Sequence, residues 1–260
     1  MTAVALPQQA VGPTFSLAKM LHARIKTVEA VQLIAKQIRP GMIERQAKDL
    51  AKATLEQMGM ERIWHGIIVR FGHTTQKTFN QRIDPDNVLG ENDIFFIDLG
   101  VVWDGHEGDA GDTFVVGHDT QMQDCAMAAR QLWQTVRDKW LQDGCAGSEL
   151  YEYAAKQAEA MGWQLNLEIK GHRVSDFPHA IYQAGNLGDF AACPDTGLWT
   201  LEIQIRHPTL PYGAFYEDLL IREMASAEAC AKHPYQTSGC FPTAPYSYHM
   251  FSRQPLAASW

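Results

Sequence analysis

Apolar residues recur at helical spacing in two stretches of the chain, and each stretch ends at a glycine. The first covers residues 17–34 and stops at Pro40 and Gly41, and the second covers residues 122–140 and stops at Gly144. Residues three and four apart lie on one face of a helix, and glycine or proline ends such a pattern. The pattern therefore predicts an amphipathic helix before each glycine turn.

The segments that follow these two glycine turns are similar to each other. Gly41 and Gly59 bracket one alanine-rich segment, and Gly144 and Gly162 bracket the other at the same spacing. Each segment indicates a further helix, so a unit of helix, glycine turn and helix occurs twice, as in an internal repeat. The alternative is that alanine-rich helices resemble one another by chance.

β-branched and aromatic residues follow each helix pair and predict strands. The predicted strands lie at residues 66–71, 94–103 and 109–116 in the first half and at 163–169, 199–205 and 214–221 in the second. Two α+β halves, at about 15–118 and 119–222, would form one domain over residues 1–260 with pseudo-twofold symmetry and a tail at 223–260. We expect a site where the halves meet.

A hairpin predicted in the first half brings two aspartates close together. Asp104 and Gly105 are the dipeptide that a two-residue hairpin turn prefers. Such a turn places Gly100 opposite Asp109, and Asp98 on the same face two residues along, so that the aspartates are diagonal neighbours. Two adjacent carboxylates on an apolar hairpin are costly unless a cation neutralises them.

The second half pairs two acids in a similar way. Glu202 and Glu217 are each embedded in strand sequence, and His172 lies before them in the chain. Taken singly, each acid could point to solvent from the polar face of a strand. Taken together, four acids at matched places and one imidazole suit one or two divalent ions such as Mn, Fe, Co or Zn.

Five motifs carry a resemblance to a known superfamily. They lie at residues 38–44, 97–117, 171–179, 201–202 and 216–218. In this order they resemble the motifs of the pita-bread metallohydrolases, which include methionine aminopeptidase, prolidase, Xaa-Pro aminopeptidase and creatinase. The resemblance covers residues 15–221 and implies an α+β pita-bread fold. It also implies a dinuclear metal-dependent hydrolase that cleaves an amide or other C–N bond, most commonly a prolidase-like aminopeptidase.

The resemblance also implies a set of metal ligands. Asp98 would bind one ion, Asp109 and Glu217 would bridge two ions, and His172 and Glu202 would complete the second. A water between two such cations becomes hydroxide near neutral pH and attacks a polarised carbonyl.

Three further roles follow from the same resemblance. Glu202 would be the general base for the attacking water. His179 would hydrogen-bond the substrate or the tetrahedral intermediate. His73 is the candidate for the substrate-facing histidine of the superfamily, with a surface or capping role as its alternative.

Several residues depart from the superfamily pattern. Arg173 replaces a glycine after His172 and would fill space or bind a substrate carboxylate. Asp112 stands where prolidase-like members carry arginine, Ile203 and Gln204 replace proline and glycine, and Ala180 replaces an acid. These departures keep open a specialised non-peptidase metalloenzyme of a biosynthetic or catabolic pathway. A further alternative is a non-catalytic binding protein on the same fold, although such members generally lose ligands and none is missing here.

Composition excludes some partners. The chain has 22 Lys and Arg against 30 Asp and Glu, a net charge of −8, without a basic run. Nucleic acid and anionic membranes both require clustered positive charge. Apolar runs fall short of the roughly 20 residues of a membrane helix. We therefore expect a cytoplasmic protein with a small-molecule or short-peptide substrate, no contact with nucleic acid or membrane, and a homodimer as the candidate assembly.

The cysteines and the tail complete the predictions. Five cysteines without a CxxC pair indicate reduced thiols rather than a disulfide framework. The tail carries many aromatic residues without helical or strand period, and we expect it to cover the domain or a partner subunit. These aromatic residues are Tyr235, Phe241, Tyr246, Tyr248, Phe251 and Trp260.

Overall fold

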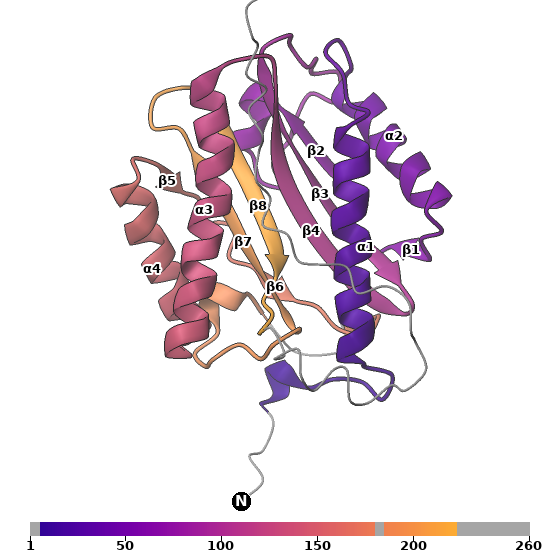
Figure 1. The fold of residues 1–260 in the computed structure, drawn as a ribbon, viewed down its shortest axis with the longest axis vertical. Coiled ribbons are helices and arrows are strands. Elements are labelled where there is room, and N and C mark those ends of the chain that lie inside the picture. The colour runs from indigo at the N-terminus through magenta and orange to yellow at the C-terminus, as the bar shows by residue number, and fades with distance from the viewer. Residues whose placement is uncertain (1–5, 180–184, 223–260) are drawn as a thin grey trace, which may run out of the picture. The chain divides into compact units, whose positions relative to one another are not determined.

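Two pairs of helices pack on one face of an eight-stranded antiparallel sheet (Figure 1). The computed structural model describes residues 6–179 and 185–222. The four α-helices of this part are α1 (Leu17–Ala35), α2 (Glu44–Gln57), α3 (Thr120–Asp143) and α4 (Gly147–Ala160).

The sheet has the order β1-β3-β4-β8-β7-β5, with β2 pairing with β3 and β6 with β7. Strands of the first half thus lie on one side, strands of the second half lie on the other, and the halves meet between β4 and β8. The strands are β1 (Arg62–Ile63), β2 (Ile68–Phe71), β3 (Asp93–Trp103), β4 (His106–Val116), β5 (Gln164–Leu165), β6 (His172–Arg173), β7 (Trp199–Arg206) and β8 (Gly213–Leu219). Short 3-10 helices among the described residues include η1 (Pro7–Gln9), η2 (Gly72–Gln76) and η4 (Leu187–Asp189).

The predicted glycine turns between the helices of each pair are confirmed. Gly41 lies between α1 and α2 with a φ of 86°, and Gly144 ends α3 with a φ of 62°. Gly59 and Gly162, which follow the second helix of each pair, also have positive φ. A residue with a side chain adopts this left-handed conformation only at a cost, which explains why glycine marks both repeats.

The predicted hairpin is also confirmed. Asp104 and Gly105 both have positive φ, 49° and 69°, and they join β3 to β4. The register pairs Gly100 with Asp109, as the two-residue turn requires. The turn dipeptide therefore determines which residues of the two strands share a face.

One predicted strand is mostly wrong. Within residues 163–169 the strand covers only Gln164–Leu165. Asn166 ends it: its amide Nδ2 donates to Gln204 Oε1 at 2.5 Å, and its side-chain oxygen accepts from Glu168 N at 3.2 Å. An asparagine that bonds the backbone two residues on makes a turn, so the apolar residues after it leave the sheet.

The buried core lies between the sheet and the helices. Ile97, Leu99 and Val101 of β3 pack with the apolar faces of α1 and α2. Leu201 and Ile203 of β7 pack in the same way with α3 and α4. Because side chains alternate along a strand, the residues between them face the other side of the sheet. That side carries the polar cluster described below.

Three further predictions concern this part of the chain. Cys125, Cys145 and Cys193 are free thiols. Among the helices of residues 6–179 and 185–222, none has the length and hydropathy needed to cross a bilayer. Ala180, Cys230, Cys240 and the predicted tail at 223–260 lie outside the described residues.

Candidate metal centre

Three acids lie in one row across the sheet, on the face opposite the helices. The strand register pairs Asp98 with Gly111, Gly111 with Glu217, and Glu217 with Glu202. Neighbouring strands are about 4.8 Å apart, so residues in such a row are within side-chain reach. Gly111 therefore separates Asp98 from Glu217 at the junction of the two halves, and the Phe215 ring packs so closely on it that a Cβ there would come within 2.5 Å of Phe215 Cε1.

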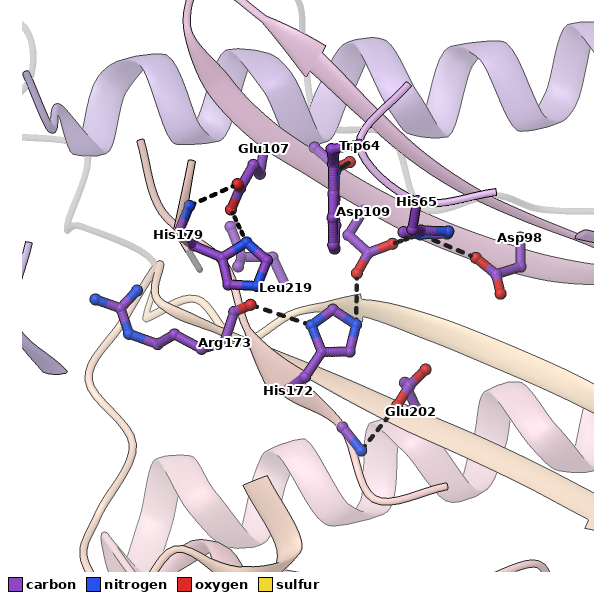
Figure 2. A network of polar contacts seen from close by, with 12 residues as sticks. Trp64, His65, Asp98, Glu107, Asp109, His172, Arg173, His179, Glu202 and Leu219 are labelled. Atoms are coloured by element: carbon purple, nitrogen blue, oxygen red, sulfur yellow. Dashed lines mark hydrogen bonds and ion pairs between the residues drawn. The ribbon is translucent and has the colours of Figure 1, made fainter. Parts of the chain in front are cut away.

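Asp109 lies on the same face of β4, two residues before Gly111. Its Oδ2 is 2.9 Å from Nε2 of His172, and its Oδ1 is 3.1 Å from Nε2 of His65 (Figure 2). His172 reaches this position from β6, where it pairs with Thr200 beside Glu202. The structure thus brings together the five predicted ligands, Asp98, Asp109, His172, Glu202 and Glu217.

His65 belongs to this cluster although the sequence analysis did not select it. It lies between β1 and β2, and its Nε2 is also 3.5 Å from Asp98 Oδ1. The imidazole lies over Gly100, where a Cβ would come within 1.9 Å of His65 Cδ2. The only sequence signal was a glycine on the aspartate face of the hairpin, which leaves space for a side chain from elsewhere.

Burial and mutual repulsion dominate the electrostatics of the carboxylates. Burial raises the pKa of Glu202 to about 7 and, together with Asp109 and Asp98, raises the pKa of Glu217 well above its ordinary value. Burial also raises the pKa of Asp98. These three carboxyl groups therefore resist ionisation together unless positive charge is close to them.

The two histidines supply part of that positive charge. Burial lowers the pKa of His172, but Asp109 outweighs it and raises the value to about 10. Burial opposes the charge of His65 as well, and Asp98 and Asp109 raise its pKa to about 9. Against its own burial, Asp109 keeps a pKa below its ordinary value because it contacts both imidazoles.

The donor atoms of the cluster fit divalent metal ions. Asp98 Oδ1 and Glu217 Oε1 are buried without a hydrogen-bond partner. Ligand atoms lie within 4.8 Å of one another in two groups, His65 with Asp98 and Asp109, and Asp109 with His172 and Glu217. Asp109 is common to both groups, as expected of a carboxylate between two cations. Buried charges require such a partner.

Glu202 and His179 are held beside these groups by separate contacts. Glu202 Oε2 accepts a hydrogen bond from Gly171 N at 2.8 Å. His179 Nδ1 lies 2.7 Å from Glu107 Oε2, and Glu107 Oε1 accepts from His179 N at 2.9 Å (Figure 2). Glu107, which the sequence analysis missed, is only 1% exposed and shares the site face with Asp109.

Trp64 packs among the three histidines of the site. Its ring is edge-on to His65, His172 and His179, with centroid distances of 4.5, 5.7 and 5.1 Å. The indole Nε1 donates to Gly108 O at 3.2 Å, which fixes the ring over the hairpin. One aromatic side chain therefore restricts the rotamers of all three imidazoles.

A cavity of about 530 Å³ opens on this cluster. Asp98, His172 and Glu202 line it, together with His65 and His179. The rest of the lining is mostly apolar and basic but includes one acid and one amide: Trp64, Gly66, Ile67, Ile68, Phe79, Ile169, Gly171, Lys48, Arg70, Lys170, Glu168 and Asn186. The volume lies within the usual range for small-molecule sites.

The structure does not bring two of the predicted substrate residues to this cavity. Arg173 is 1% exposed, and its guanidinium donates to the carbonyl oxygens of Gln8, at 2.9 Å, and of Ala10. Figure 2 shows this side chain directed away from His172. His73 is exposed on η2 and does not line the cavity. Of the roles expected for these two residues, the structure thus fits the ones away from the substrate: Arg173 fills space and anchors the N-terminal segment, and His73 is a surface histidine.

The other departures from the superfamily pattern also have structural partners. Asp112 Oδ1 accepts from Arg130 Nε at 2.7 Å, on the helix side of β4. Ile203 belongs to the core with α3. Gln204 Nε2 donates to Thr75 O at 3.0 Å. None of them lines the described cavity.

The helix pairs, the sheet and the acid–histidine cluster define a two-half α+β fold with a candidate metal-binding cluster at the junction of its halves. The chain belongs to metallopeptidase family M24, which its sequence matches over residues 18–221. A search among curated proteins found no significant match.

Solved structures confirm the predicted pita-bread fold. X-Pro aminopeptidase from Thermotoga maritima has 18% identity and a TM-score of 0.65, over 80% of this chain and 58% of that enzyme. Prolidase from Pyrococcus furiosus has 20% identity and a TM-score of 0.66, over 83% of this chain and 63% of that enzyme. Methionine aminopeptidase from Thermotoga maritima has 16% identity and a TM-score of 0.65, over 81% of this chain and 94% of that enzyme. The chain thus spans less than two thirds of the first two enzymes.

Proposed function

We propose that this chain is a dinuclear metal-dependent peptidase that cleaves an amide bond of a short peptide. The observation that carries the proposal is a pair of acid–histidine groups that share Asp109, with Glu202 opposite Glu217 on the next strand. In these groups Asp98 and Glu217 keep buried oxygens without a hydrogen-bond partner. Membership of family M24 supports it.

Asp98, Asp109, His172, Glu202 and Glu217 would hold two divalent ions, of which Mn, Fe, Co and Zn are the candidates. When bound, such ions polarise the scissile carbonyl and lower the pKa of a water near it. Asp109 and Glu217 lie on the two strands that meet at the junction of the halves, so one bridging carboxylate would come from each half.

The remaining steps belong to side chains that line the cavity. Glu202 is held by Gly171 N and would take the proton of the attacking water and deliver it to the leaving amine. His179 is held by Glu107 and would donate a hydrogen bond to the oxygen that becomes negative in the transition state. The apolar wall formed by Ile68, Phe79 and Ile169 would exclude water from the substrate.

The substrate class follows from the size of the cavity and from the names of the relatives. A cavity of about 530 Å³ accommodates a short peptide. Prolidase and X-Pro aminopeptidase are among the structures with this fold, so peptides with a proline are the first candidates. A cytoplasmic location and a homodimer remain predictions.

The specialised non-peptidase alternative rested on Arg173, Asp112 and Ile203. All three are engaged in structural contacts away from the cavity, so they do not favour a different reaction. The non-catalytic binding alternative expects a lost ligand, whereas all five predicted ligand residues are present in the cluster.

The test is metal content and turnover measured on the same protein. The chain is purified without chelator, its metal is counted by elemental analysis, and dipeptides, Met-peptides and Xaa-Pro peptides are assayed with Mn, Fe, Co and Zn. Asp98→Ala should lose bound metal and all turnover, whereas Asp112→Asn should keep both. Full metal binding by Asp98→Ala would overturn the metal site, and a fully metallated wild type without peptide turnover would overturn the peptidase assignment.

A further inference from the structure

We propose that His65 is a sixth metal ligand, so that each of the two ion positions has one imidazole. The inference rests on the proposed function, because it assumes that ions bind at Asp98 and Asp109. It concerns a residue from the segment between β1 and β2, outside the five ligands that the sequence motifs indicate.

The two imidazoles are placed equivalently about Asp109 (Figure 2). His65 Nε2 lies 3.1 Å from Asp109 Oδ1, and His172 Nε2 lies 2.9 Å from Asp109 Oδ2. Each imidazole therefore contacts its own oxygen of the shared carboxylate. An ion between His65, Asp98 and Asp109 would be the counterpart of an ion between His172, Glu217 and Asp109.

The second ring nitrogen of each histidine has the contact that a metal ligand requires. His65 Nδ1 is 3.1 Å from Gly66 O, and His172 Nδ1 is 3.1 Å from Arg173 O. A proton on Nδ1 is then donated to a backbone carbonyl, which leaves the lone pair of Nε2 free to coordinate. In both histidines this carbonyl belongs to the next residue in the chain.

The hairpin provides the space for the His65 ring. A Cβ at Gly100 would come within 1.9 Å of Cδ2 and 2.3 Å of Nε2 of His65. Gly100 pairs directly with Asp109, so the imidazole lies over the residue opposite the shared ligand. Trp64 packs edge-on against the ring and restricts its orientation.

The additional nitrogen changes which ions the first position prefers. Carboxylates alone suit Mn, whereas an imidazole adds affinity for Fe, Co and Zn. With His65 both positions become mixed nitrogen and oxygen sites. A role for His65 in orienting substrate would leave ion number and ion preference unchanged, and a role in orienting carboxylates would leave the number of imidazoles per ion unchanged.

The experiment compares ion binding by wild type, His65→Ala, Gly100→Ala and His179→Ala. Each folded protein is dialysed against Co²⁺, Zn²⁺ or Mn²⁺, the bound ions are counted, and X-ray absorption measures the number of imidazoles per ion. Gly100→Ala keeps His65 but displaces its ring, so it tests the position of the imidazole. His179→Ala removes a histidine of the same cavity that contacts Glu107 rather than the cluster.

We expect His65→Ala and Gly100→Ala to weaken one of two ion positions by more than about tenfold, since loss of even an outer partner of a ligand costs at least that. The number of imidazoles per ion should fall by half, the preference of that position should shift toward Mn, and free imidazole should restore the ion in His65→Ala. His179→Ala should keep both ions.

Unchanged ion affinities and imidazole number in both His65→Ala and Gly100→Ala would overturn the inference and leave the proposed function intact. Wild-type protein that binds no ion would overturn the proposed function instead, and the inference with it. Metal binding as expected, without turnover of any peptide, would overturn the peptidase assignment and support the role of His65.

Discussion

The two halves of the molecule use the same scaffold but deliver their acids differently. In the first half, β3 and β4 have 11 residues each and are joined by a two-residue turn, and the aspartates are diagonal neighbours. In the second half, β7 and β8 have eight and seven residues, and Glu202 directly faces Glu217. The shorter side chains thus belong to the longer hairpin.

The difference shows how a repeated unit acquires distinct halves of one site. Both hairpins pack their alternate apolar residues on a helix pair, so the face toward the helices is alike. The other face differs in register and side-chain length, which sets how far each carboxylate extends toward the junction. Gly111 lies between Asp98 and Glu217 at the junction, where the Phe215 ring packs against it.

The largest expected effect comes from the carboxylate that the two groups of ligands share. Asp109→Asn should lose bound metal at both positions, because Asp109 contacts both imidazoles. Turnover should then fall by at least about a thousandfold, the upper end for loss of one electrostatic contact. Elemental analysis and peptide assays measure the two effects.

Asp112→Asn is the matched control, three residues further along β4 and bonded to Arg130 on the helix side. It should keep its metal and lose stability by about 1.5–3 kcal/mol, the range for a hydrogen bond to a charged group. If both variants lost metal equally, the alternation of faces along β4 would not define the site.

The next effect tests whether His179, unlike His172, acts on the substrate rather than on the metal. His179→Ala should lower kcat by about 10²–10³-fold, as for the loss of one transition-state hydrogen bond, with metal content unchanged. Glu107→Gln should lower kcat less, because His179 remains but its ring loses a charged partner. Steady-state kinetics with metal analysis measure this. Loss of metal in His179→Ala would place it among the ligands.

A smaller effect tests the repeat itself. Gly41 and Gly144 have positive φ and open space around the position of a Cβ, so alanine at either should cost the same, about 1–2 kcal/mol of left-handed strain. Gly66→Ala, with ordinary φ and open space, is the control and should leave stability unchanged or slightly raised. Urea unfolding measures all three. Clearly unequal costs at Gly41 and Gly144 would mean that the turns are not equivalent.

The smallest effect concerns the N-terminal segment, which contacts the second half at Asp176. Burial raises the pKa of Asp176, but hydrogen bonds from Thr14 Oγ1 at 2.6 Å, Ser175 Oγ and Gly12 N outweigh it and lower the value. Because the folded-state pKa is the lower one, the stabilisation is present above about pH 4 and is lost as pH falls through the folded-state value.

The variant Asp176→Asn should therefore be less stable than wild type by about 0.5–1.5 kcal/mol at pH 7, with a difference that shrinks under acid. Urea unfolding of both proteins between pH 7 and pH 3 measures it. A difference that stayed constant over this range would show that ionisation of Asp176 contributes nothing.

Local patterns were enough to predict most elements and the hairpin acids. The helix ends follow from Gly41 and Gly144, and the positions of Asp98 and Asp109 follow from the turn at Asp104 and from strand alternation. The strand predicted at 163–169 was mostly wrong because the side chain of Asn166 accepts from Glu168 N two residues on and is held there by Gln204, a partner 38 residues away in the chain. A local window contains the asparagine but not the distant partner that holds it.

The sequence by itself determined the repeated architecture, the family and the identity of the acids, because these depend on periodicity, turn chemistry and motif order. Only the tertiary structure decided which histidine joins them. His65 reaches the cluster from the short segment between β1 and β2, because the space above Gly100 accommodates its ring. Arg173 contacts the N-terminal segment instead, because neighbouring strand residues point to opposite faces of the sheet. Positions of this kind depend on contacts between distant segments, which no local pattern records.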